Sequence, residues 1–219
     1  MSNTAIVVAL LVGIAVWFAV ASRLTAKPWE NREQKGDVGV LHMSPQRIGL
    51  WVFMAVVTSL FALFLTAYSM RMHHSIGWCH LTIPNILWVN TAILLAASVA
   101  LQLAANAVSG GRRDATRTAL VAAGTLSIGF LAGQVLAWRA VGPSLYFVQG
   151  SPAIAFFYVL TIVHGLHLLG GLAVLGRASL RFAGGAELVD LRQSLSLCAT
   201  YWHFLLLVWL AVFGVLLFL

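Results

Sequence analysis

The sequence has very little charge. Of its 219 residues only 9% are charged, whereas 61% are hydrophobic. A soluble globular domain carries about 25% charged residues. Six runs reach the length of about 20 apolar residues that a helix needs to cross a bilayer. They are residues 4–22, 48–69, 86–107, 117–138, 152–175 and 196–218. Because an open sheet cannot cross lipid, we predict an all-α fold, a polytopic transmembrane helical bundle with six spans.

Carboxylate, lysine and arginine side chains are missing from the apolar core of every run. All six acidic residues fall in the loops between them: Glu30, Glu33, Asp37, Asp114, Glu187 and Asp190. Proton pumps and ion-coupled transporters usually place charged groups near the middle of the membrane. The composition therefore argues against a self-sufficient pump and against a small transporter.

Cysteine and catalytic motifs are also scarce. Cys79 and Cys198 are the two cysteines, and they fall on loops or helix ends at opposite sides of a membrane about 30 Å thick. A disulfide needs Cα atoms within about 7 Å, so we expect none within this chain. The sequence contains no P-loop, GxSxG, HExxH or CxxC motif. It therefore shows no catalytic machinery of its own.

The basic residues that are present predict the topology. Of the 13 lysines and arginines, all but Arg71 and Arg139 fall in loops 23–47, 108–117 and 176–195. Basic loops stay on the cytoplasmic side of a membrane, so we predict these three loops inside and both termini outside. The net charge of +7 therefore reflects the membrane topology, and it also favours contact with anionic lipid. We expect no nucleic-acid partner.

The first apolar run resembles a signal peptide in part. However, residues 1–3 carry no positive charge, and the run has the length of a full span. We therefore expect a retained N-terminal transmembrane helix at residues 1–23, a cytoplasmic linker at 24–47 and a five-helix membrane domain at 48–219.

Three histidines lie inside the last two spans: His164, His167 and His203. A histidine within a bilayer is costly and marks a functional or partner-facing position. At 1.5 Å per residue, His167 and His203 lie about 12 and 11 Å from the inner ends of their spans, and adjacent helices would bring all three together. Such a group could bind a metal or haem. We favour hydrogen bonding across helix contacts, because no carboxylate is available to orient a metal-bound imidazole.

Small and polar residues mark helix contacts. Gly129 and Gly133 form a small-xxx-small pair that lets two backbones approach closely. The third span has a polar edge, and the fourth has one polar residue inside it: Asn90, Thr91, Ser98 and Gln102, then Gln134.

Two stretches at the C-terminal end carry a family resemblance. "FYVLTIVHGLHLLGGL" and "YWHFLLLVWLAVF" resemble the last two helices of subunit III of the haem–copper oxidases, the cytochrome c oxidase type. "GLWVFMA", "LWVNTAILLAASVALQLA" and "GFLAGQVLAW" are similar to the same family, so the resemblance covers about residues 47–219. It implies that the following residues are packing or lipid-contact positions: Asn90, Gln134, His164, Gly165, His167, Gly170, Gly171, Tyr201, Trp202, His203, Phe204 and Trp209.

The resemblance also implies a role. Such a chain is a non-catalytic core subunit beside oxidase subunit I and other oxidase subunits, in the bacterial cytoplasmic (inner) membrane. It binds no haem or metal, which belong to the catalytic partners, and it holds phospholipid while supporting O2 reduction and proton uptake. A haem-binding membrane cytochrome that uses His203 with His164 or His167 is the alternative.

Three positions depart from the family pattern. Val57, Ala137 and Leu206 stand where the family commonly has carboxylates. The resemblance therefore indicates a divergent member, to which any role that depends on those acids does not carry over directly.

Overall fold

The computed structural model describes residues 45–74, 85–141, 152–185 and 187–217, all within Met43–Leu219, the second of two units of the chain. The described residues form helices and no strand: α2 (Pro45–His74), α3 (Ile86–Ser109), α4 (Arg113–Val141), α5 (Pro152–Ala183) and α6 (Leu188–Leu216). All five are long and apolar enough to cross a membrane. They confirm an all-helical, multi-pass fold. The first predicted span, 4–22, on which the count of six depends, lies outside the described residues, as does Cys79.

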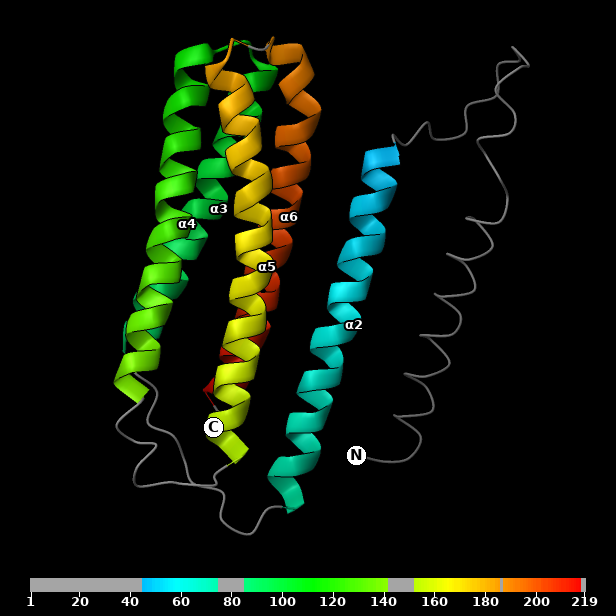
Figure 1. Ribbon diagram of the computed structural model, residues 1–219, viewed down its shortest axis with the longest axis vertical. Helices are drawn as coiled ribbons and strands as arrows, with labels where there is room; N and C mark the ends of the chain where they lie inside the picture. Colours follow the sequence, from blue (N-terminus) through cyan, green and yellow to red (C-terminus); the bar gives the residue numbers. More distant parts are fainter. Residues whose placement is uncertain (1–44, 75–84, 142–151, 186, 218–219) are drawn as a thin grey trace, which may run out of the picture. The chain divides into compact units, whose positions relative to one another are not determined.

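Tight turns join two pairs of helices. Gly111 lies between α3 and α4 with φ of 70°, and Gly185 lies between α5 and α6 with φ of 87°. Glycine adopts this left-handed conformation without the steric penalty that a Cβ would bring. The helices of each pair therefore run antiparallel (Figure 1).

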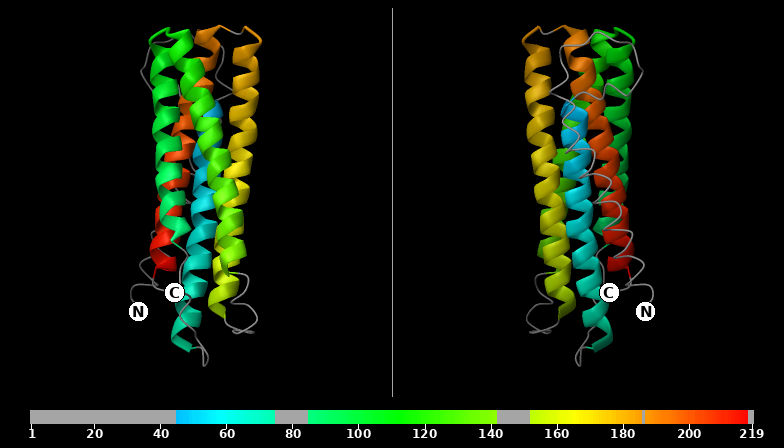
Figure 2. Two further views of the ribbon diagram at one scale, coloured as in Figure 1. Left: turned by 90° about the vertical axis from the view of Figure 1, so that its left-hand side faces the viewer. Right: turned by 90° about the vertical axis from the view of Figure 1, so that its right-hand side faces the viewer.

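Each helix packs on at least two others. α3 packs on α4 and α6, α5 packs on α4 and α6, and α2 packs on α5 and α6. The side views show that the axes of the described helices are roughly aligned with one another (Figure 2). The α3–α4 contact is the most extensive, and it contains the predicted small-residue pair.

The helices extend well beyond the predicted spans. The region 176–195, which we expected to be a loop, is mostly helical, because α5 continues to Ala183 and α6 begins at Leu188. Hydropathy detects only the part of a helix that crosses the hydrocarbon layer, about 30 Å thick. The 32 residues of α5 span about 48 Å at 1.5 Å per residue. Its last turn holds Arg181, a cation that the negative end of the helix dipole favours.

The interior of the bundle contains polar side chains as well as apolar ones. The buried polar side chains are Asn90, Ser98, Thr116, Ser127, Gln134, Thr161 and His164. Large apolar side chains face outward instead, such as Leu63, Leu180 and Leu207, which are 70%, 75% and 66% exposed. This arrangement is typical of helices that pack in lipid, because lipid tails are as apolar as leucine and hydrogen bonds help to hold the helices together.

Candidate functional site

His164 lies in the centre of the bundle on α5. It is completely buried, and its ring is surrounded by Trp209, Phe130 and Phe61 at centroid distances of 5.1, 5.8 and 6.4 Å. Neither of its nitrogens has a hydrogen-bond partner within the described part of the chain. The imidazole therefore packs as an aromatic ring between α2, α4 and α6.

His167, one turn further along α5, is only partly buried. Its Nδ1–H donates to the Val163 carbonyl at 2.7 Å, and its ring lies 5.7 Å from that of Phe61. Its own carbonyl accepts a hydrogen bond of 3.1 Å from the Tyr201 hydroxyl, which ties α5 to α6.

His203 faces α3 instead. The Ser98 hydroxyl lies 2.6 Å from its Nδ1, and Gln102 Oε1 lies 3.1 Å from its Nε2. Because an amide oxygen only accepts, Nε2 carries the proton and Nδ1 accepts from Ser98. Ser98 is buried, whereas Gln102 and His203 are exposed.

The three histidines do not form one metal-binding cluster. Among the residues that the structure describes, no group of three or more His, Cys, Asp or Glu side chains could hold a metal ion. His164 and His167 share the ring of Phe61, but His203 bonds to α3. Depth along the helices predicted that the three would meet. The rotation of α6 about its axis, which depth does not specify, points His203 at α3.

The glycines beside these histidines differ in their surroundings. A Cβ on Gly171 would lie 2.8 Å from Tyr201 Cε1 and 3.0 Å from Trp202 Cζ3, whereas a Cβ on Gly170 would meet nothing within 4 Å. A Cβ on Gly165 would touch only Leu131, at 3.9 Å. Only Gly171 is therefore required for the close approach of α5 and α6.

Two tryptophans of α6 join it to α3 and α4. Trp202 Nε1 donates to Ser127 Oγ at 3.2 Å, and Trp209 Nε1 donates to Thr91 Oγ1 at 2.9 Å. Both indoles are fully buried. Phe204 stacks on Tyr201 at 6.4 Å. These four aromatic residues therefore pack in contacts within α6 or between α6 and its neighbours.

The two predicted amides lie inside the bundle. Asn90 Nδ2 donates to the Phe130 carbonyl at 3.4 Å across the α3–α4 contact. Gln134 is 2% exposed, and neither of its amide atoms has a partner among the described residues. Val57 and Ala137, at which the resemblance implied carboxylates in other members of the family, are buried too.

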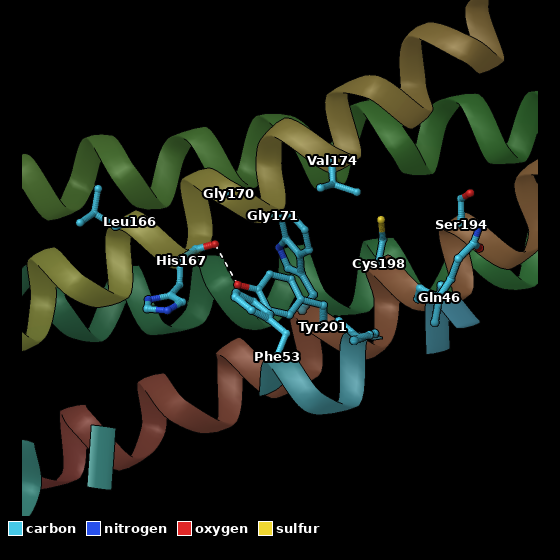
Figure 3. Close-up of a pocket in the computed structure, with 13 residues that line it drawn as sticks. Gln46, Phe53, Leu166, His167, Gly170, Gly171, Val174, Ser194, Cys198 and Tyr201 are labelled. Carbon is cyan, nitrogen blue, oxygen red and sulfur yellow. Dashed lines mark hydrogen bonds between the residues drawn. The ribbon is translucent and has the colours of Figure 1, made fainter. Parts of the chain in front are cut away.

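An open groove of about 640 Å³ runs between α2 and the α5–α6 pair. Figure 3 shows His167, Gly170, Gly171 and Tyr201 along it, with Phe53 of α2 opposite. Its remaining lining consists of Gln46, Leu50, Leu166, Val174, Ser194, Leu197, Cys198 and Trp202. Five of the predicted motif residues therefore line this one groove: His167, Gly170, Gly171, Tyr201 and Trp202.

Sequence reasoning missed the α2 side of this groove and its far end. Phe53 lies in a helix without an apolar stripe, and Gln46 and Ser194 lie in regions predicted as linker and loop. The alternation of polar and apolar residues that marks a buried face in water is absent from α2, so no local signal marked them.

The comparisons with known proteins identify a family. The family model for cytochrome c oxidase subunit III matches residues 35–219. The probable cytochrome c oxidase subunit 3 of Mycobacterium tuberculosis is 29% identical over 129 residues, which are 58% of this chain and 63% of the relative's length. The cytochrome bo(3) ubiquinol oxidase subunit 3 of Pseudomonas aeruginosa is 26% identical over 172 residues, or 76% of this chain and 81% of the relative. With the family model matched along most of its length, this chain belongs to the cytochrome c oxidase subunit III family.

Proposed function

We propose that this chain is a non-catalytic core subunit of a respiratory haem–copper oxidase in the bacterial cytoplasmic membrane. It packs beside the catalytic subunit I, where it supports O2 reduction and proton uptake mechanically and through bound phospholipid. Haem and copper belong to the partner subunits. The membership in the subunit III family supports this role, and the groove between α2 and α5–α6 is the observation that carries the lipid part of it.

The chemistry of the groove suits a phospholipid. Leu50, Phe53 and Val174 give it apolar walls within the membrane-spanning part of the helices. Its polar lining includes Gln46 at the start of α2 and Ser194 in the second turn of α6. Acyl chains fit the apolar walls, and a headgroup fits the polar end near the helix termini.

Basic residues follow at that polar end. Arg47 is next to Gln46, Arg192 lies two residues before Ser194, and Arg177 lies one turn beyond Val174 on α5. Residues three apart on a helix share a face, so Arg177 continues the groove-lining face of α5. Arginine pairs well with phosphate. The charge at this end therefore complements an anionic headgroup.

The groove can be filled without disturbing the fold, because a Cβ on Gly170 would meet nothing within 4 Å. Gly170→Leu places an apolar side chain where the acyl chain would lie. We expect the purified oxidase to retain less phospholipid, measured as lipid phosphorus per haem, and to lose activity faster during sustained turnover.

Gly176→Leu is the matched control. Gly176 lies on the same helix, its added Cβ would also meet nothing within 4 Å, and it is not part of the groove. If the two variants retain equal phospholipid, the groove does not hold the lipid and that part of the proposal is wrong.

The basic loops support a topology in which both termini lie outside. In this topology the turns between α3 and α4 and between α5 and α6 face the cytoplasm. Membrane-impermeant thiol labelling from outside should reach a cysteine introduced at Ser144 and should not reach one at Ala183. The reverse labelling pattern would invert the proposed orientation.

A further inference from the structure

One histidine is exposed at the middle of the membrane-spanning region. His203 lies 15 residues after the start of α6 and 13 before its end, so it is about 20 Å from either end of the helix. It is exposed on the bundle surface. Ionisable residues at this depth almost always face a bundle interior or a water-filled cavity and not lipid. Its exposure indicates that something other than lipid covers it.

His203 begins a chain of hydrogen bonds along the surface of α3. Its Nε2–H donates to Gln102 Oε1 at 3.1 Å, and Gln102 Nε2 donates to Asn106 Oδ1 at 3.1 Å. Ser98, Gln102 and Asn106 are four residues apart and therefore share one face of α3. We call Ser98, Gln102, Asn106 and His203 the polar ladder.

The polar ladder has hydrogen-bond donors left over. Each oxygen in the chain accepts one bond, but within the described part of the chain Asn106 Nδ2 and the second hydrogen of Gln102 Nε2 find no acceptor. Both side chains are exposed. Asn106 lies 3 residues before the end of α3, near the membrane surface, whereas Gln102 lies about 10 Å from that end. Lipid tails offer Gln102 no acceptor, and an unsatisfied polar group in hydrocarbon is costly. A neighbour that covers this face would therefore have to supply an acceptor oxygen at the depth of Gln102.

Apolar side chains flank the ladder and complete a surface for helix packing. Val99 and Leu103 on α3 are 50% and 57% exposed, and Leu207 and Leu210 on α6 are 66% and 49% exposed. A helix that packs here would bury these side chains around a polar centre.

We propose that the polar ladder face of α3 and α6 is the surface on which a neighbouring oxidase subunit packs, through a membrane helix that offers a hydrogen-bond acceptor at the level of Gln102. This inference rests on the proposed function and locates the partner on the molecule. The chain's own N-terminal run does not supply the acceptors, because residues 5–21 contain no polar side chain apart from the indole of Trp17. A second copy would bring the same unpaired amide hydrogens as well as its amide oxygens, and crosslinking distinguishes it from another subunit.

Photo-crosslinking in the assembled oxidase tests the proposal. A photoreactive amino acid at Leu103 should give an adduct with another integral subunit of the complex. Val121 on α4 is the matched control: it is 59% exposed against 57% for Leu103. It lies 8 residues from the start of α4, and Leu103 lies 6 residues from the end of α3, at the same end of the bundle. We expect no subunit adduct from Val121.

The outcomes separate the two claims. If the tagged chain brings down no haem protein, the proposed function is wrong and the surface assignment falls with it. If it brings down the oxidase but Leu103 gives no adduct, an adduct with a second copy, or no more than Val121 gives, the surface assignment is wrong and the function stands.

Substitution of the ladder gives a second readout. Gln102→Leu should raise the ratio of released to bound subunit in detergent about 3-fold, the usual effect of one interhelical hydrogen bond in a membrane protein. Thr118→Val is the control, because Thr118 is exposed near the same end of the bundle and bonds only to the Asp114 carbonyl of its own helix. Equal release of the two variants would show that the ladder does not hold a partner.

Discussion

The contact between α3 and α4 predicts that alanine is destabilising at Gly133 but tolerated at Gly129. A Cβ on Gly133 would overlap the amide of Asn90 and lie 2.8 Å from its Cγ. Carbon atoms pack at about 3.5–4.0 Å, so Gly133→Ala requires a shift of about 1 Å. A Cβ on Gly129 would lie 3.9 Å from Ile93 Cγ2, an ordinary contact.

Two relaxations are open to Gly133→Ala, and both are costly. Rotation of Asn90 breaks its bond to the Phe130 carbonyl and leaves a buried amide unpaired, at about 1–3 kcal/mol. Separation of the helices instead costs about 1–3 kcal/mol, as overpacking generally does. Alanine regains up to about 1 kcal/mol over glycine inside a helix. We expect a net loss of about 1–2 kcal/mol for Gly133→Ala, and for Gly129→Ala no loss or a gain of up to about 1 kcal/mol.

Equilibrium unfolding of the purified full chain by SDS in mixed micelles, followed by circular dichroism, measures this difference of about 2 kcal/mol. The double variant Asn90→Ala/Gly133→Ala should recover part of the loss, because the overlapping side chain is gone. Equal stability of the two alanine variants, within about 0.5 kcal/mol, would refute the assignment of Gly133 as the point of close approach.

Three further predictions follow from buried or motif residues. Val57→Glu buries a carboxyl at a position that is 2% exposed, and it should lower the free energy of unfolding by about 2–3.5 kcal/mol. The number of protons that the oxidase pumps per electron should stay unchanged. A large gain in that number would place the site in a proton path. Trp209→Phe loses the bond to Thr91 and should cost about 1–2 kcal/mol, whereas Trp88→Phe, at a side chain 58% exposed, should cost less than about 0.5 kcal/mol. The purified chain without partners should show no haem absorbance, and a Soret band that disappears in His203→Ala would support the cytochrome alternative.

The sequence by itself determined the fold class and five of the membrane helices. Crossing a bilayer requires a long apolar helix whatever its neighbours are, so hydropathy along the chain was sufficient. The same holds for Gly133, because a small residue four positions from another marks close helix approach in lipid. The resemblance of residues 47–219 to subunit III also depended on sequence alone, and the family model confirms it.

The tertiary structure decided which way each helix faces. In water an apolar stripe points to the core, but lipid is as apolar as the interior, so hydropathy does not fix the rotation of a membrane helix. For this reason depth alone grouped His203 with His164, whereas packing buried His164 among aromatic rings and turned His203 toward Ser98. The groove likewise depends on how the helices are rotated and packed. Phe53 and Tyr201 come from helices far apart in the sequence, and they meet only when α2 packs on α6.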